Sequence, residues 1–148
     1  MIDLFRGDNF FLSNFYPCTI TVSKEIYPSV EHAYQALKST NPKIRLPFQN
    51  PELTPGKAKR MGKDIILRKD WELIKINIMH TLVLKKFKDK GLARKLINTY
   101  PDELVEGNPW GDTFWGVSNG KGENNLGKIL MSVRSSLIAK IEPKIINK

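Results

Sequence analysis

The stretch from Lys69 to Lys90 places the strongest constraint on the fold, because its apolar residues repeat with the period of an α-helix. These residues form two neighbouring stripes: Trp71, Ile74, Ile78 and Leu82, and then Ile76, Met79, Val83 and Phe87. Apolar side chains on so wide an arc predict a helix that is buried on more than one side. Such a helix needs other elements around it, so the sequence predicts a mainly α-helical domain.

Further helices are predicted from capping residues and apolar spacing. Ser29 can cap a helix over Val30 to Ser39, and Thr54 can cap a short helix that runs from Pro55 to Gly62. A segment from Leu92 to Asn98 is predicted to be helical as well. The last helix is expected over residues 126–141. Its inward-facing residues are Leu126, Ile129, Leu130, Val133, Leu137 and Ile141. Four prolines in residues 41–55 predict an irregular connector.

One small β element is expected near the N-terminus. The β-branched run Thr19–Val22 can pair with Ile26–Tyr27 across Ser23 to Glu25, which predicts a short hairpin. The chain of 148 residues is long enough to bury a core of its own. We therefore expect one domain over residues 1–148, α-rich with a small N-terminal β element.

Composition narrows the class of protein. Apolar residues make up 41% of the chain and charged residues 26%, as in soluble globular proteins. No stretch approaches the roughly 20 apolar residues of a membrane-spanning helix. No basic start followed by an apolar run is visible, and Cys18 is the only cysteine. These features predict a cytoplasmic protein without a membrane segment or an internal disulfide.

The positive charge is concentrated in the middle of the chain. The whole sequence carries a net charge of +9, and thirteen Lys/Arg against four Asp/Glu fall between Lys57 and Lys95. Such a stretch can attract a phosphate or a nucleic acid. The alternative is a solvated lysine face that keeps the protein soluble.

The segment Gly107–Met131 is the strongest candidate for a ligand site. Trp110 and Trp115 stand on either side of the acid Asp112, and a turn rich in glycine and asparagine follows. A carboxylate between two aromatic plates suits a flat ring that carries a sugar and a phosphate. Two alternatives stay open: the tryptophans fill the core, and Asp112 forms a turn by accepting a nearby backbone N–H.

Other candidate residues also have two interpretations. Glu31 lies in the first turn of a predicted helix and shares a face with Gln35 and Lys38; it is either a functional acid, which His32 could support, or an exposed acid that favours the helix dipole. Trp71 is either functional or a core anchor, and His80 is expected to pack in the core. Residues 120–125 precede a helix and could bind phosphate, although no strand precedes them as a dinucleotide fold requires.

Six segments, taken together and in order, resemble the YbiA-like, or NADAR, family of N-glycosidases. They are FLSNFYP (11–17), SVEHAYQALK (29–38), KAKRMGK (57–63), LRKDWE (67–72), DTFWG (112–116) and GKGENNLGKILM (120–131). The resemblance implies a mainly α-helical single domain that cleaves N-glycosidic bonds in phosphoribosyl compounds. YbiA-like members act on early riboflavin intermediates, the ribosylamino-pyrimidine phosphates. Other members remove ADP-ribose from guanine bases.

The resemblance also implies a set of site residues. The family's catalytic positions fall on Glu31, Trp71 and Asp112. Further residues are expected to bind the substrate: Asn14, Arg60, Arg68, Lys69, Trp115, Gly122 and Asn124. The chain departs from the family after Gly116, where Val117-Ser118-Asn119 replaces the more common acidic or glycine residues. This difference affects the choice of leaving group more than the reaction.

The implied chemistry suits these residue types. Cleavage of a ribosyl C–N bond builds positive charge on the sugar, which a carboxylate stabilises while a carboxylate also orients the attacking water. Glu31 and Asp112 can divide these roles in either order. With one cysteine and two histidines, the sequence argues against a metal site, and no cofactor is expected. A non-enzymatic nucleotide-binding module and a hydrolase acting on ADP-ribosylated nucleic acid remain the competing hypotheses.

Overall fold

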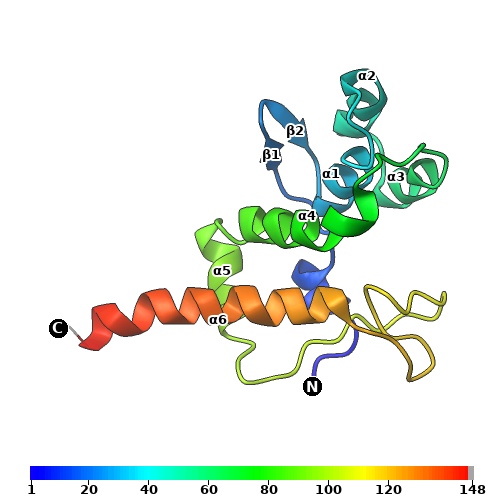
Figure 1. Cartoon of the computed structure of the whole chain (residues 1–148). Helices are drawn as coiled ribbons and strands as arrows, with labels where there is room; N and C mark the ends of the chain where they lie inside the picture. Colours follow the sequence, from blue (N-terminus) through cyan, green and yellow to red (C-terminus); the bar gives the residue numbers. More distant parts are fainter. Residues whose placement is uncertain (147–148) are drawn as a thin grey trace. The chain divides into compact units, whose positions relative to one another are not determined.

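Helices dominate the structure, as the sequence predicts, and the only sheet within the described residues has two strands (Figure 1). The computed structural model describes residues 1–146, with side chains up to Ile141. The chain divides into two compact units. We call Asn14–Lys86 the inserted unit, and Met1–Ser13 together with Phe87–Lys148 the terminal unit.

Each unit has its own set of elements. The inserted unit contains β1 (Ile20–Val22), β2 (Glu25–Tyr27), α1 (Val30–Ala36), α2 (Pro42–Arg45), the 3-10 helix η2 (Leu46–Gln49), α3 (Pro55–Gly62) and α4 (Trp71–Lys86). The terminal unit contains the 3-10 helix η1 (Gly7–Leu12), α5 (Lys90–Ile97) and α6 (Asn125–Ile146).

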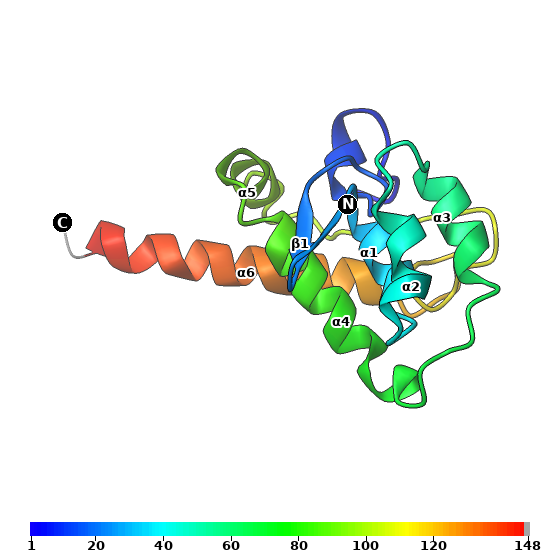
Figure 2. The same ribbon diagram turned by 90° about the horizontal axis from the view of Figure 1, so that it is seen from above.

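Helix α1 forms the centre of the inserted unit. It contacts α3, α4, η2 and both strands, and all seven of its residues are buried (Figure 2). The predicted cap is confirmed, because the Ser29 side chain accepts a hydrogen bond from the His32 backbone N–H. The helix ends at Ala36 and not at Ser39 as predicted. The reason is that Lys38 and Ser39 donate to carbonyls three residues back, which tightens the last turn.

The hairpin is confirmed with a shorter turn than predicted. Ile20 pairs with Tyr27 and Val22 with Glu25, so strand β2 already begins at Glu25. Ser23 and Lys24 make the turn, and Ser23 has a φ of 53°. Such a left-handed backbone is what a two-residue turn between antiparallel strands commonly requires.

The proline-rich connector is more regular than predicted. Asn41 caps α2 by accepting a hydrogen bond from the Lys43 N–H, and two of the four prolines, Pro42 and Pro47, occupy the first turns of α2 and η2. A proline at that position removes an N–H that has no partner in the helix, so the prediction of an irregular segment is wrong. The predicted helix over Pro55–Gly62, with Thr54 as its cap, is confirmed as α3.

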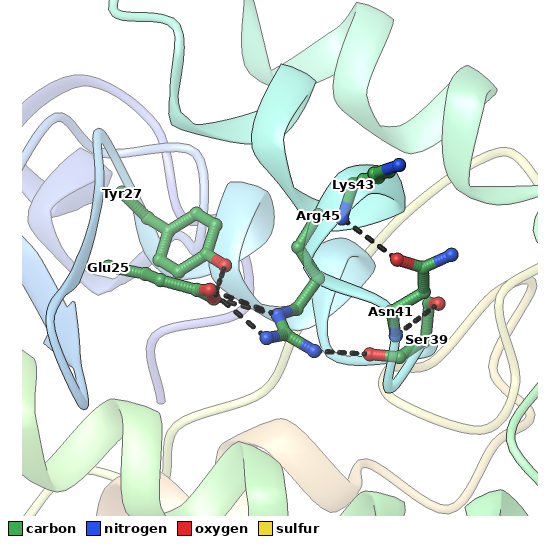
Figure 3. A network of polar contacts seen from close by, with 6 residues as sticks. All are labelled: Glu25, Tyr27, Ser39, Asn41, Lys43 and Arg45. Carbon is green, nitrogen blue, oxygen red and sulfur yellow. Dashed lines mark hydrogen bonds and ion pairs between the residues drawn. The ribbon is translucent and has the colours of Figure 1, made fainter.

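A polar network ties α2 to the hairpin (Figure 3). The Arg45 guanidinium binds the Glu25 carboxylate with a shortest distance of 2.7 Å and donates to the Ser39 carbonyl at 3.2 Å. The Tyr27 hydroxyl donates to the same carboxylate at 2.8 Å. The Arg45 hydrogen bond lowers the pKa of Glu25, and burial together with Glu25 raises the pKa of Tyr27. The network therefore fixes one end of the hairpin against the helices.

The two helices predicted over Lys69–Lys90 and Leu92–Asn98 are both present, but the boundary between them lies earlier than predicted. Helix α4 ends at Lys86, and α5 starts at Lys90 because the Asp89 side chain caps it by accepting from the Leu92 N–H at 2.9 Å. Members of both apolar stripes are buried, which confirms burial on more than one side. The buried apolar residues of α4 are Trp71, Met79, Leu82 and Val83. Ile76 of the second stripe is exposed, and His80 is half-buried and not fully packed.

In the terminal unit, the N-terminal segment pairs with the segment that follows α5. Ile2 forms a parallel bridge with Leu104, and α5 packs on α6. The expected inward residues of α6 are buried from Leu126 to Val133, whereas Leu137 is half-buried and Ile141 is 42% exposed. The prediction for Ile141 is therefore wrong. Among the helices within residues 1–146, none is long and apolar enough to span a membrane.

Candidate functional site

Glu31 is a buried acid at the start of α1. It is the second residue of the helix and only 7% exposed. Its backbone N–H donates to the Asn14 carbonyl at 3.1 Å, and its Oε1 accepts from Gln35 Nε2 at 2.7 Å. The interpretation as an exposed acid that only serves the helix dipole is wrong. Burial of a carboxylate is costly, so its retention in this place points to a functional role.

The polar face of α1 holds together as its spacing predicts. Gln35 bonds Glu31, and Lys38 lies one turn further along. The Lys38 ammonium approaches the Gly62 carbonyl at 3.4 Å and the Tyr34 ring at 5.9 Å. Burial lowers the pKa of Lys38, the charge of Glu31 opposes this shift, and two other lysines add to it. A positive charge therefore lies near the buried carboxylate.

His32 does not support Glu31 as expected. Its Nδ1 lies 2.6 Å from Ser29 Oγ and its Nε2 lies 2.6 Å from the Leu53 carbonyl oxygen. Because a carbonyl only accepts, Nε2 donates to Leu53 and Nδ1 accepts from the Ser29 hydroxyl. Burial lowers the pKa of His32, which keeps the ring neutral. This histidine connects α1 to the segment before α3.

Trp71 packs next to α1. It is 4% exposed, and its ring centroid lies 5.2 Å from that of Tyr34 at an interplanar angle of 50°. Its backbone N–H donates to the Arg68 carbonyl, which starts α4. The interpretation as a core anchor therefore holds for this side chain. Trp71 thus packs against α1, the helix that carries Glu31.

Asn14 lies next to Glu31. Its carbonyl accepts the Glu31 N–H, and its Nδ2 approaches Met79 Sδ at 3.5 Å. The segment before α1 is thereby joined to α4. Asn14 and Glu31 are thus predicted site residues from different elements that a hydrogen bond connects directly.

The predicted phosphate ligands are more dispersed. Arg68 and Lys69 line a pocket of about 480 Å³ next to Ser39 and Thr40, whereas Arg60 lies exposed on α3 and does not line it. The Arg68 guanidinium binds Asp70 at 2.6 Å and lowers the pKa of that carboxyl. Arg68 can bind a phosphate only in competition with Asp70, while Lys69 is exposed.

Asp112 belongs to the terminal unit and forms the turn that the sequence offers as an alternative. Its Oδ1 accepts from the backbone N–H groups of Phe114 at 3.1 Å and Trp115 at 2.9 Å. The Asn108 side chain binds both the N–H and the carbonyl of Asp112. Within the described residues, Oδ2 makes no hydrogen bond, so the turn leaves one carboxylate oxygen available for chemistry.

The two tryptophans of this loop differ. Trp115 is half-buried and stands perpendicular to Phe114, with centroids 4.8 Å apart. Trp110 is 56% exposed, so it does not fill the core. The loop thus carries one partly exposed tryptophan before Asp112 in the sequence and another after it.

Gly122 and Asn124 hold the loop together. A Cβ on Gly122 would lie 2.1 Å from the Gly116 carbonyl oxygen, and the residue has a φ of 151°. The buried Asn124 amide donates to the Leu104 carbonyl at 2.9 Å and accepts from the Glu106 N–H at 3.0 Å. These contacts assign both residues a role in loop structure, where substrate binding was expected.

The start of α6 is not the open anion site that the sequence suggests. The N–H groups of Asn125 and Leu126 donate to the carbonyls of Phe114 and Trp115. Helix N-termini attract phosphate through N–H groups that lack a partner. That prediction for residues 120–125 is therefore wrong, because carbonyl groups of the aromatic loop already accept hydrogen bonds from these N–H groups.

The candidate residues fall into two sets, one in each unit. Asn14, Glu31 and Trp71 surround the start of α1 in the inserted unit, while Asp112 and Trp115 share one turn of the terminal unit. Gln35 and Asn108 were not expected as site residues. The i, i+4 spacing could have indicated Gln35, but nothing in the sequence marks Asn108. No cluster of three or more metal-ligating side chains occurs among the described residues.

Known proteins resemble this chain over most of its length. The N-glycosidase Npun_R5314 of Nostoc punctiforme is 39% identical over 130 residues, which cover 84% of this chain and 83% of the relative. The riboflavin biosynthesis protein VVA0006 of Vibrio vulnificus is 40% identical over 86% of this chain, but only 35% of that longer protein is matched.

A solved structure and a family model complete the comparison. The NMR structure of the Escherichia coli protein YbiA matches with a TM-score of 0.81 and 35% identity, covering 96% of this chain and 90% of YbiA. The model of the NADAR domain matches residues 4–138. The chain therefore belongs to the NADAR family.

Proposed function

We propose that this protein hydrolyses the N-glycosidic bond of a phosphorylated ribosyl compound, with Glu31 and Asp112 as its catalytic acids. The observation that carries the proposal is the Glu31 carboxylate, which is 7% exposed, held by Gln35 and placed near the Lys38 charge. A carboxylate held in a dry site is what a developing sugar cation requires for stabilisation. The reaction class follows from the relatives, which are named N-glycosidases.

The proposed substrate is an early intermediate of riboflavin biosynthesis, a ribosylamino-pyrimidine phosphate. Two relatives are named riboflavin biosynthesis proteins, one from Vibrio vulnificus and one from maize. Only 35% and 23% of these longer proteins match the chain. Such a substrate has a base to stack on an aromatic ring and a phosphate for the basic pocket beside Arg68 and Lys69.

The two acids suit different roles in this reaction. Glu31 is buried and rigid, so it stabilises the positive charge that develops at C1′ of the ribose. Asp112 is half-buried and has one oxygen without a hydrogen bond within the described residues, so it orients the attacking water. Trp71 and Trp115 are the candidates to contact the leaving base. The bond from C1′ to nitrogen breaks, water adds to C1′, and the base leaves with a proton.

The experiment is product analysis with purified protein. We expect free base and ribose 5-phosphate to appear together when the chain acts on a ribosylamino-pyrimidine phosphate. Removal of the phosphate should reduce kcat/KM far more than a change of a ring substituent, and EDTA should leave the rate unchanged. Equal rates with the dephosphorylated compound, or loss of activity with EDTA, would contradict the proposal.

The second candidate substrate is ADP-ribosylated guanine in nucleic acid. The observation that favours it is the basic stretch Lys57–Lys95, in which Arg60 and Lys69 are exposed. An oligonucleotide that carries ADP-ribosyl-guanine is therefore the second arm of the same assay. Release of ADP-ribose, with a rate that falls steeply as salt is added, would select this substrate. Binding of either compound without products would instead indicate a binding module.

A further inference from the structure

The Gln35 side chain lies between Glu31 and the end of α3. Its Nε2 donates to Glu31 Oε1 at 2.7 Å, and both side chains are more than nine-tenths buried. Its own Oε1 is buried without a hydrogen-bond partner within the described residues. A buried amide oxygen without a donor is unfavourable, and an apolar side chain in this place would avoid that cost. The donor end of Gln35 must therefore serve a purpose.

Gly62, the last residue of α3, leaves the space that this amide occupies. A Cβ on Gly62 would lie 1.8 Å from Gln35 Oε1 and 2.5 Å from its Cδ. No side chain fits there while Gln35 keeps its position. Gly56, at the other end of the same helix, differs, because a Cβ there would meet only a guanidinium nitrogen at 3.9 Å. Only one of the two glycines in α3 is thus required by its surroundings.

The contact between α1 and α3 fixes which way the amide points. Lys38 Nζ reaches the Gly62 carbonyl at 3.4 Å, so the same glycine is contacted from α1 and from the turn that follows it. If the amide of Gln35 were rotated by half a turn, its oxygen would face the Glu31 carboxylate and repel it. The hydrogen-bond network therefore assigns the nitrogen to Glu31 and the oxygen to Gly62.

We propose that Gln35 is a positioning residue for Glu31, and that Gly62 is the site on α3 that holds Gln35 in place. The inference rests on the proposed function, because it concerns how Glu31 is oriented for the reaction. Gln35 does not contact the reacting atoms in this scheme; it fixes the orientation of the Glu31 carboxylate through one of its oxygens. Small displacements of a catalytic group can reduce the rate by about 10²-fold.

The test compares kcat, KM and thermal stability in four variants. Gln35→Met keeps the length of the side chain and removes the donor, so kcat should fall about 10- to 100-fold while KM changes little. Gly62→Ala should reduce kcat to a similar extent because it displaces Gln35. Gly56→Ala is the matched control in the same helix and should keep both constants. The double variant Gln35→Ala/Gly62→Ala should regain the stability that Gly62→Ala loses, but not its kcat.

The outcomes separate this inference from the proposed function. If Glu31→Gln abolishes turnover while Gln35→Met and Gly62→Ala keep the kcat of the wild type, the positioning role is wrong and the proposed function stands. If Glu31→Gln itself keeps its rate, the proposed site is wrong. If Gln35→Met does not fold, Gly62→Ala against Gly56→Ala decides, because the amide is then displaced and not removed. A fall in stability without a fall in kcat of the folded protein would make Gln35 purely structural.

Discussion

The two candidate acids are held in different ways. Glu31 lies in a helix that is buried all round, and its carboxylate is bound by the Gln35 side chain. Asp112 lies in a loop, is half-buried, and its carboxylate is bound by two backbone N–H groups. The helix thus supplies rigidity through packing, whereas the loop supplies it through glycine and asparagine. The difference implies that a substitution can remove the charge of Asp112 with less damage to the fold than a substitution that removes the charge of Glu31.

The largest effect is expected from removal of either charge. Glu31→Gln and Asp112→Asn should each lower kcat by about 10²- to 10³-fold, because each removes a charge that acts in the transition state. If both acids act on one substrate, the double variant should lose much less than the product of the two single losses. Steady-state kinetics on a confirmed substrate measure this. Near-wild-type rates in both single variants would remove these residues from the mechanism.

A smaller effect, on stability alone, is expected from the glycines of the loop. Gly122→Ala should lower the free energy of unfolding by about 3 kcal/mol, because the new Cβ would overlap the Gly116 carbonyl and φ is positive. Gly120 also has a positive φ, of 76°, but open space around it. Gly120→Ala should therefore cost only about 1 kcal/mol. Urea denaturation measures both values, and equal losses would mean that the close contact does not exist.

The turn at Asp112 gives a third comparison. Asp112→Ala removes the acceptor for the Phe114 and Trp115 N–H groups and should cost about 1 kcal/mol of stability. Asp112→Asn keeps an oxygen in the same place and should cost less, although it loses the charge. Thermal melting of the two variants checks this. If the asparagine variant is as unstable as the alanine variant, the charge itself and not the turn stabilises the loop.

The smallest expected effect concerns pH and the buried helix. Burial lowers the pKa of His32 below its ordinary value of 6.5, so below about pH 6.5 the unfolded chain binds more protons than the folded one. The stability that this neutral histidine contributes is present above pH 6.5 and is lost as the pH falls toward the folded-state pKa. His32→Gln should flatten this part of the curve of unfolding free energy against pH. If the slope is unchanged in His32→Gln, the loss of stability at low pH comes from protonation of carboxylates instead.

The local elements were predictable from the sequence where short-range chemistry decides them. Ser29 and Thr54 lie where caps belong, and the hairpin has its β-branched run next to a turn. The break between α4 and α5 was placed too late, at residue 91, because apolar spacing continues through Phe87, whereas the cap at Asp89 already starts α5. The short helix α2 was missed because Pro42 was taken as a helix breaker, although it occupies a first-turn position.

Candidate site residues could be named from the sequence, but their contacts could not. Glu31, Trp71 and Asp112 came from the resemblance to a family, and the helical spacing placed Gln35 and Lys38 on the face of Glu31. The contact of Gln35 with Gly62 depends on how α1 packs on α3, and no local sequence pattern indicates that packing. Likewise, the roles of Gly122 and Asn124 in loop structure follow from contacts with residues 104, 106 and 116.

The order of the two units along the chain has a consequence for synthesis on the ribosome. Residues 14–86 form one unit as a continuous segment, and its ends lie near each other, because Lys86 Nζ is 5.5 Å from the Tyr16 ring centroid. This segment can fold as soon as it has left the exit tunnel. The first thirteen residues, in contrast, must wait for their partners, since Ile2 pairs with Leu104. A nascent chain stalled near residue 120 should therefore already protect Met79 from proteases, while its N-terminus is still being cut.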